Sequence, residues 1–571
     1  MKKNSFKFCH HLLTSFFFSF IALAALTAFT ACTNDTDEND DDSSSSSSSS
    51  TSDVLFIQIL AGDNSLNDSC YADMVSVQNG LALCLDSNKK WTDLSVRVIA
   101  FWDGLNNSTG SESDKSNKYY IEKSRVLELK ANSTLLADRN VIKNNVYSSE
   151  EADFFSTTDG FTDLSSTASF LSSTSGSQEV DMTQSSTILS FLSWVNTHYK
   201  GTKRTILSFS GQGIGPRGML SDSSNPNQYL STRSLGKLLK QSGFAKNKFF
   251  MIIENASTTA TIENAYELRN YADYLMLSPG LGSSSGYDYK NIIPALAASD
   301  SSSIPDNLIK IFQQSYSSVS SLGVSNWASL LTSTKTKMEA LSDKGIEYYS
   351  CDWTTNPSSG DYSGTSKVIT ESNFDRYLGG NSSYISNPMP SLTIVASSKL
   401  DALYEKWNLL SNLLNTAISD STVKTNLNSK LTALPFQLYY QSSYEKLFDA
   451  ASLLNQLSDL ITDGTLSDSI SCNSTTYSLS STITEVKAAL VDAITCAYRM
   501  GQTEMDEVSG LYSRASSSNL TDILYYSTSS SSCAYGLSIV SSSYSDTYKN
   551  NLEFANSNAW ASFLQSMYSS N

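Results

Sequence analysis

Continuous apolar runs alternate with amphipathic stretches along the chain from residue 53 onward. The runs Val54–Leu60 and Val96–Trp102 are rich in β-branched and aromatic residues, and they predict strands that are buried on both faces of a sheet. Between them, apolar residues recur at helical spacing over Leu66–Gln78, which predicts a crossover helix with Asn64 or Ser65 as its cap. These elements form a β-α-β unit with two parallel strands.

The same alternation continues to about residue 289. Further helices are predicted at the apolar stripe Ile188, Phe191, Leu192 and Val195 and at Ser231–Gln241, and further strands at Thr205–Phe209, Phe249–Ile253 and Tyr274–Ser278. This succession predicts an α/β domain over residues 53–300, with a mainly parallel sheet between two layers of helices. The functional site of such a sheet lies beyond the carboxyl ends of its strands, where Gly211–Gly218 and Asn255–Thr259 follow two consecutive strands.

Two parts of the chain have other patterns. Residues 103–181 are polar and rich in Ser and Thr, and we interpret them as a surface insertion. Residues 301–571 predict a helix-rich C-terminal region, in which Thr482–Glu485 is typical of a capping box for a helix that ends near Gly501. A short strand is predicted close to the C-terminus, at Ala534–Val540.

The first 52 residues are patterned for export. Lysines precede the apolar stretch FFFSFIALAALTAFTAC, which is typical of a signal peptide over residues 1–31. Its end, FTAC, resembles the bacterial lipobox and predicts lipidation of Cys32, with an ordinary signal peptide or a membrane anchor as the alternatives. Residues 32–52 are acidic and then poly-Ser, so we expect a flexible tether to a bacterial membrane, at the cell surface or on the periplasmic face.

Composition limits the partners and the chemistry. The formal net charge of −17 argues against nucleic acid as a partner, while 40% hydrophobic and 11% aromatic residues indicate a folded chain. Six cysteines follow Cys32, without the CxxC or Cys/His spacing of a zinc site. After the signal peptide the chain contains a single histidine, His198.

Several stretches resemble the clostripain family of cysteine peptidases. LFIQILAGDNSL (Leu55–Leu66) is similar to that family's opening strand and Asp-Asn-x-Leu turn. The nearest matches are ENAYELRNYADYLMLS (Glu263–Ser278) and GYDY (Gly286–Tyr289), and further similar stretches lie at Val180–Tyr199, Met219–Lys240 and Leu552–Leu564. The resemblance implies a caspase-like α/β/α sandwich.

The family's working positions carry other residues here. Gln212 occupies the place of the histidine in the family's His-Gly-x-Gly element, and Ser257 the place of the cysteine in its Asp-Ala-Cys element. Asn255 stands where the resemblance places the acid that favours basic substrate side chains. A hydroxyl needs a positioned base to become a nucleophile, and a carboxamide cannot take up a proton near neutral pH.

Two other residues could supply a base to Ser257, and Ser257 itself has a commoner role. His198 is expected at the opposite end of the sheet from Ser257, and Glu254 is expected to point to the other face of its strand. The commoner role of Ser257 and Thr258 is to cap the following helix. GQGIGPRG lacks the last glycine of a dinucleotide-binding loop, and we interpret it as a loop whose backbone amides once faced a substrate.

The sequence therefore predicts an exported, lipid-anchored, clostripain-like protein without peptidase activity, whose former substrate cleft binds a protein or peptide. One alternative is an active hydrolase that uses Ser257 with an unusual base. Another is a cell-surface adhesin that binds through residues 103–181. No cofactor or metal site is predicted, because the family resemblance allows calcium but no run of residues here indicates where it would bind.

Overall fold

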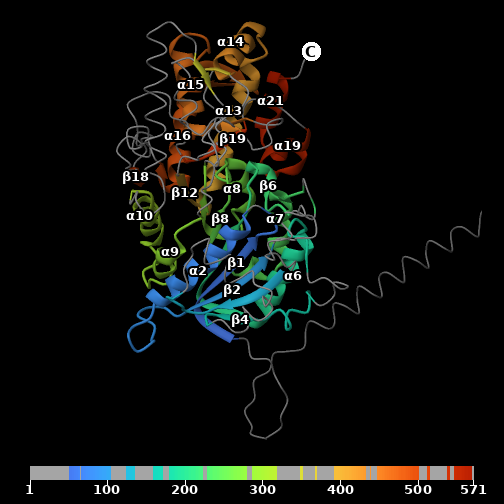
Figure 1. The fold of residues 1–571 in the computed structure, drawn as a ribbon. Coiled ribbons are helices and arrows are strands. Elements are labelled where there is room, and N and C mark those ends of the chain that lie inside the picture. Colours follow the sequence, from blue (N-terminus) through green and yellow to red (C-terminus); the bar gives the residue numbers. More distant parts are fainter. Residues whose placement is uncertain are drawn as a thin grey trace, which may run out of the picture. The chain divides into compact units, whose positions relative to one another are not determined.

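The computed structural model describes the chain in segments, which begin with β1 and end with α21 (Figure 1). The described residues are 50–64, 66–104, 124–134, 159–171, 179–222, 225, 228–279, 286–317, 348–350, 367–369, 391–432, 437–438, 446–499, 511–514, 536–540 and 546–568. The predicted signal peptide, Cys32 and nearly all of the tether lie outside them.

The largest sheet in the described part of the chain has ten strands, in the order β18-β17-β12-β9-β8-β5-β1-β2-β3-β4. Its five central strands are parallel: β9 (Ala272–Leu277), β8 (Phe249–Asn255), β5 (Tyr199–Ser210), β1 (Ser50–Ala61) and β2 (Val96–Asp103). Antiparallel strands flank them, namely β3 (Ser124–Leu129) and β4 (Phe161–Asp163) on one side and β12 (Ser391–Ala396), β17 (Ile494–Arg499) and β18 (Leu511–Arg514) on the other. The sheet is therefore mixed, and the predicted parallel arrangement is confirmed for its five central strands.

Helices cover both faces of this sheet, as Figure 1 shows for α2 and α9 on one side and α6 and α7 on the other. One layer contains α2 (Asn67–Leu83), α9 (Tyr289–Leu296) and α10 (Ile304–Ser317), and the other contains α6 (Ser185–His198), α7 (Thr232–Gln241) and α8 (Ile262–Leu268). Alternate residues of β1 enter the two cores, because successive side chains of a strand point to opposite faces. The fold is the predicted α/β/α sandwich.

The C-terminal region continues the same sheet and contributes to both of its cores. Its strands β12, β17 and β18 lie beyond β9, so the sheet runs across the boundary predicted at residue 300. Figure 1 shows α13 (Leu400–Ala417), α15 (Ala450–Thr462), α16 (Leu479–Ala493) and α21 (Ala559–Tyr568) together, in orange to red. Trp407 and Trp560 meet edge to face between α13 and α21, with ring centroids 5.6 Å apart.

This region contains further helices and strands. The helices are α14 (Ser421–Thr432), α19 (Asp546–Asn551) and α20 (Glu553–Ser557). The strands are β10 (Tyr348–Ser350), β11 (Lys367–Ile369), β13 (Gln437–Leu438), β14 (Lys446–Asp449), β15 (Ser469–Cys472), β16 (Thr475–Ser478) and β19 (Ser538–Val540). The last strand lies within the predicted Ala534–Val540.

Two predictions are wrong in detail. Residues 103–181 are not only a surface insertion, because β3 and β4 extend the sheet and Val126 and Leu127 are fully buried. The predicted capping box at Thr482 is also wrong. Helix α16 begins at Leu479, where the Ser478 hydroxyl accepts a hydrogen bond from the Ser481 amide, and it ends at Ala493.

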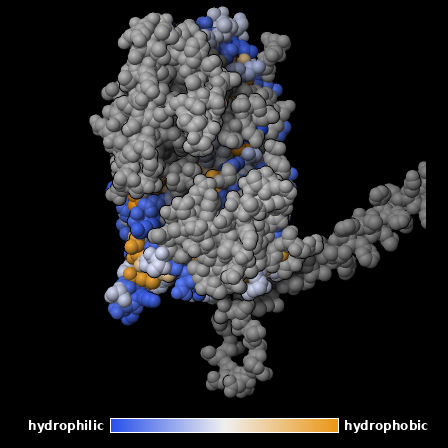
Figure 2. Space-filling view, in the orientation of Figure 1, coloured by the Kyte–Doolittle hydropathy of each residue, from blue (hydrophilic) through white to orange (hydrophobic). Residues whose placement is uncertain are grey.

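Exposed apolar side chains are few in the described part of the chain. On the face drawn in Figure 2, the coloured surface is mainly hydrophilic, with small separate hydrophobic spots. The large hydrophobic side chains that are exposed among the described residues are Leu83 and Trp91. None of the described helices is long and apolar enough to cross a membrane.

Candidate functional site

The loops that follow β5 and β8 are in direct contact at the carboxyl end of the sheet. Ser210 and Asn255 are paired at the ends of these two parallel strands, and Gln212 and Ser257 each follow two residues later. A Cβ atom on Gly213 would lie 2.1 Å from the Ser257 carbonyl oxygen and 2.7 Å from its amide nitrogen. Because only glycine fits at this distance, residue 213 allows the two loops to touch. The structure therefore brings the predicted site residues together.

Gln212 is held by the segment that follows its own loop. Its Oε1 accepts a hydrogen bond from the Ser221 hydroxyl at 3.0 Å, and its backbone carbonyl accepts one from the Leu220 amide at 2.9 Å. Asn64, from the turn after β1, donates to the Ser221 carbonyl oxygen at 2.9 Å. The carboxamide is thus fixed at the sheet end, where it offers hydrogen bonds but no basic nitrogen.

Asn255 is hydrogen-bonded to a buried acid, Asp73, that was not predicted from the sequence. Its Nδ2 donates to Asp73 Oδ2 at 3.1 Å, and the Ser210 hydroxyl donates to the same oxygen at 2.8 Å. Burial raises the pKa of Asp73 to about 7, although both hydrogen bonds act to lower it. The sequence does contain a sign of this buried acid. Asp73 lies on the apolar face of a predicted helix, at helical spacing from the buried positions Cys70 and Val77.

The bend that carries Ser257 does not cap the next helix. Thr258 adopts a left-handed conformation with φ of +57°, and its hydroxyl donates to the Ser257 carbonyl oxygen at 2.8 Å. Helix α8 is capped by Thr261, whose hydroxyl accepts from the Asn264 amide at 3.1 Å. The prediction of Ser257 and Thr258 as caps is therefore wrong. A left-handed threonine is a strained conformation of the kind that occurs at functional bends.

Neither residue considered as a base for Ser257 is placed to act as one. His198 ends α6, and its Nδ1 lies 2.8 Å from the Trp194 carbonyl oxygen. It precedes the first residue of β5, and the twelve residues of that strand span about 36 Å. Glu254 is fully buried, accepts a hydrogen bond from Asn264 Nδ2 at 2.7 Å, and has its pKa raised by burial to about 8. A carboxyl with that pKa is mostly protonated at neutral pH and cannot take up another proton.

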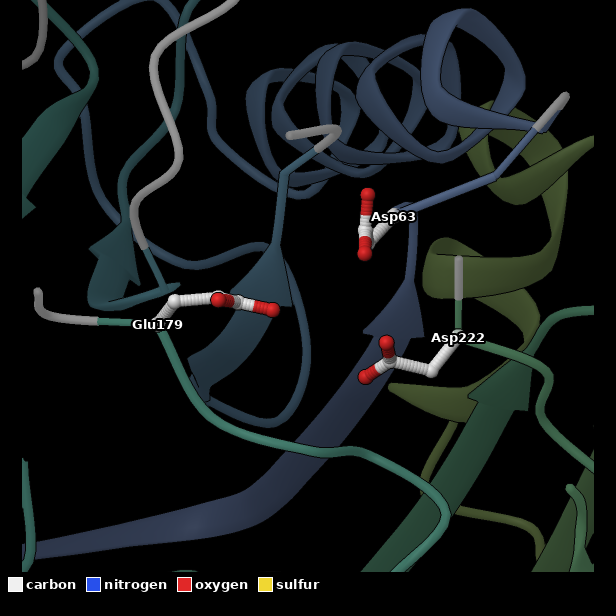
Figure 3. A group of neighbouring side chains, drawn as sticks. All are labelled: Asp63, Glu179 and Asp222. Carbon is white, nitrogen blue, oxygen red and sulfur yellow. The ribbon is translucent and has the colours of Figure 1, made fainter. Parts of the chain in front are cut away.

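Acidic side chains gather near the same end of the sheet. The carboxylate oxygens of Asp63, Glu179 and Asp222 lie within 4.8 Å of one another, and Figure 3 shows them pointing toward a common space from three segments. Asp63 immediately precedes Asn64, and Asp222 immediately follows Ser221. This group is therefore next to the hydrogen bonds that hold Gln212, and it is the set of described residues that could hold a metal ion.

Comparison with known proteins identifies the family. The model of the clostripain family matches residues 60–567. No curated protein matches the sequence. Among solved structures, the chain is similar to a secreted C11 cysteine protease from Bacteroides thetaiotaomicron in complex with an irreversible peptide inhibitor (13% identity, 88% of this chain, 98% of that chain, TM-score 0.43). It is also similar to an inactive zymogen C11 protease from Parabacteroides distasonis (13% identity, 89% of this chain, 98% of that chain, TM-score 0.46). Since the family model covers most of its length, this chain belongs to the clostripain family.

Proposed function

We propose that this clostripain-family protein is a pseudopeptidase, which binds a protein or peptide at the junction of the β5 and β8 loops without cleaving it. The observation that carries the proposal is that a carboxamide, Gln212, and a hydroxyl, Ser257, stand on two touching loops. The sequence resemblance assigns these positions to the family's histidine and cysteine. The two loops still meet at the carboxyl end of the sheet, whereas the side chains of residues 212 and 257 provide neither a base nor a readily ionised nucleophile.

The expected loss of activity is large. Loss of a nucleophile and base that act as a unit lowers the rate on the order of 10⁶-fold, which corresponds to about 8 kcal/mol of activation free energy. Among the described residues, His198 is at the opposite end of β5, and Glu254 is buried and engaged by Asn264. The alternative of a serine hydrolase with an unusual base therefore receives no support from these two groups.

The ligand is expected to differ from a peptide with a basic anchoring residue. Asn255 carries no charge, and its amide nitrogen already donates to Asp73. Its carbonyl oxygen can accept a hydrogen bond from a ligand, but it cannot pair with a lysine or arginine as a carboxylate would. We therefore expect a site that selects neutral, hydrogen-bonding side chains.

A hydrolysis assay tests the proposal. The form that comprises residues 33–571 should show no peptide cleavage above the level of its Ser257→Ala variant, with substrates that present Lys, Arg or neutral residues. It should still bind members of a fluorescent peptide library in polarisation measurements. Ser257→Trp, which fills the junction, should abolish this binding, whereas Ser257→Ala should leave it within about threefold. Cleavage that Ser257→Ala removes would instead establish a serine hydrolase.

The protein is further proposed to be exported and anchored through lipidated Cys32, with residues 33–52 as the tether. The lipobox-like FTAC and the acidic and poly-Ser segment after it support this part of the proposal. Several acyl chains at about 0.8 kcal/mol per buried methylene hold a protein on a membrane stably. Cys32→Ser should move most of the protein from the membrane to the soluble fraction and prevent labelling with a palmitate analogue. Unchanged fractionation and labelling would exclude the anchor.

A further inference from the structure

Polar side chains lie inside the otherwise apolar core between the sheet and the helices α2 and α9. Gln58 of β1 points into this core, since its neighbours on the same face of the strand, Phe56 and Leu60, belong to it. Ser208 of β5 is paired with Gln58 across the two strands, and the Tyr289 hydroxyl of α9 lies 2.9 Å from the Ser208 hydroxyl. All three polar residues are fully inaccessible to solvent.

The carboxamide of Gln58 makes no hydrogen bond within the described part of the chain. Neither its Nε2 nor its Oε1 has a partner there. A buried carboxamide without hydrogen bonds destabilises the folded state, because it has lost the bonds that it makes to water in the unfolded chain. Folded proteins satisfy such groups with protein atoms or with enclosed water. Gln58 therefore indicates a small polar ligand inside the core.

A chain of hydrogen bonds leads from this place to the loop junction. The Ser210 hydroxyl, two residues after Ser208, donates to Asp73 Oδ2 at 2.8 Å, and Asn255 Nδ2 donates to the same oxygen at 3.1 Å. Burial raises the pKa of Tyr289, and hydrogen bonds from Ser208 and Ser210 act to lower it, so its hydroxyl is close to both serines. The polar groups follow one another in the order Ser208, Tyr289, Ser210, Asp73 and Asn255.

The donors along this chain leave an acceptor at its inner end. Ser210 gives its proton to Asp73, so its oxygen can accept from the Tyr289 hydroxyl. Tyr289 can in turn accept from Ser208, whose own oxygen then needs a donor. Beside it, Gln58 Nε2 needs an acceptor. Water meets both needs at once, because it accepts from an N–H group and donates to an oxygen.

We propose that Gln58 and Ser208 bind a buried water molecule, which joins the carboxamide of the central strand to the hydrogen-bonded chain that ends at Asn255. The residues paired with Gln58 on the two neighbouring strands are Ala100 and Ser208, so small side chains flank it on both sides. The groups around the proposed site are uncharged donors and acceptors, which suit water and not an ion.

Such a water would support the ionised form of Asp73. Hydrogen bonds in a chain polarise one another, so a donor at the inner end strengthens the bond from Ser210 to Asp73. The titratable side chains near Asp73 are Cys70 on its own helix, Tyr289 on α9 and Tyr287 just before α9, and a thiol and two phenols carry no charge near neutral pH. Loss of the water should therefore raise the pH at which Asp73 gives up its proton.

Water binding can be measured directly on residues 33–571, which retain every described residue. Magnetic relaxation dispersion of ¹⁷O counts the water molecules that stay enclosed in a protein. Gln58→Met keeps the length of the side chain and removes both polar groups, so it should lower this count by about one. Ser208→Ala removes the other partner and should give the same loss. A crystal structure should show the water within about 3.2 Å of both side chains.

The matched control is Leu60→Met, which places a methionine at the next inward position of the same strand and should leave the count unchanged. Two further effects are expected of Gln58→Met. Its melting temperature should fall or stay within about 2 °C, because the carboxamide has partners to lose. The pH midpoint of the contribution of Asp73 to stability, taken relative to Asp73→Asn, should rise by about half a unit or more.

Two results would overturn the proposal. One is an unchanged number of enclosed waters in both Gln58→Met and Ser208→Ala. The other is a rise in the melting temperature of Gln58→Met by more than about 3 °C, which would show that the carboxamide is buried without a partner. An unchanged midpoint for Asp73 would overturn the link between this water and the loop junction.

Discussion

Peptidase activity should appear when Gln212→His and Ser257→Cys are combined. The two positions follow paired strand ends and lie on loops that touch at Gly213, so an imidazole and a thiol there are expected to come within reach of each other. The Ser221 hydroxyl, which now donates to Gln212 Oε1, can hydrogen-bond to one ring nitrogen and leave the other for the thiol. We expect hydrolysis on the order of 10³-fold above the Ser257→Ala background.

The rate of thiol alkylation gives an independent measurement for the same variant. A neighbouring imidazole lowers the pKa of a thiol, so the double variant should react with iodoacetamide faster at pH 6–7 than Ser257→Cys alone. Ser257→Cys serves as the matched control because it has the same thiol without the imidazole. Identical alkylation profiles would show that positions 212 and 257 do not face each other, and would remove the geometric basis of the proposed function.

Placing an acid at residue 255 should destabilise the protein. In Asn255→Asp, a carboxylate replaces the amide that now donates to Asp73 at 3.1 Å, and two acids then share one proton beside a buried strand end. At pH 8 we expect the free energy of unfolding to fall by about 2–4 kcal/mol. Asp73→Asn combined with Asn255→Asp exchanges donor and acceptor, and should recover most of the loss. Urea denaturation of the four proteins of this double-mutant cycle measures the coupling.

Burial of Asp73 makes the free energy of unfolding fall as the pH rises. The pKa of Asp73 is raised to about 7 in the folded chain from a usual value of 3.8, so the folded state retains a proton that the unfolded chain has lost. The contribution of Asp73 to stability is therefore complete below about pH 4 and is lost as the pH rises through 7. Asp73→Asn should remove this slope, and Asn255→Asp should cost less at pH 5.5 than at pH 8. A cost of Asn255→Asp that is independent of pH would contradict the shared proton.

Local patterns of apolar residues were sufficient to predict the strands of the central sheet. The strands β1, β2, β5 and β8 each contain a mainly apolar stretch, and each ends within two residues of its predicted end. Strand β5 begins at Tyr199, six residues before the predicted Thr205, because its first half is polar. The strands β3 and β4 were missed because they are short and lie among polar residues. The caps of α8 and α16 were misplaced because neighbouring Ser and Thr residues have similar propensities, and the choice of Thr261 or Ser478 depends on where the backbone turns in the folded chain.

The candidate site also has residues that the sequence predicts and residues that only the folded structure reveals. Gln212, Ser257 and Asn255 could be located from the sequence, because each follows a recognisable strand at a short distance. Asp73 contacts Asn255 although the two residues are 182 positions apart in the sequence. The acidic group of Asp63, Glu179 and Asp222 likewise joins separate segments of the chain. No local sequence pattern predicts these contacts, because they form only when the helices pack on the sheet.

The two halves of the chain contribute strands to one sheet, so neither half is expected to fold as a separate protein. A product that stopped near residue 300 would lose β12 and leave the backbone groups of β9 unpaired along one edge. It would also uncover Tyr266, whose ring stacks on Tyr404 at 4.6 Å and meets Phe554 at 5.9 Å. An exposed edge beside an apolar surface promotes self-association. Fusion, shuffling or truncation of this protein would therefore have to keep both halves together.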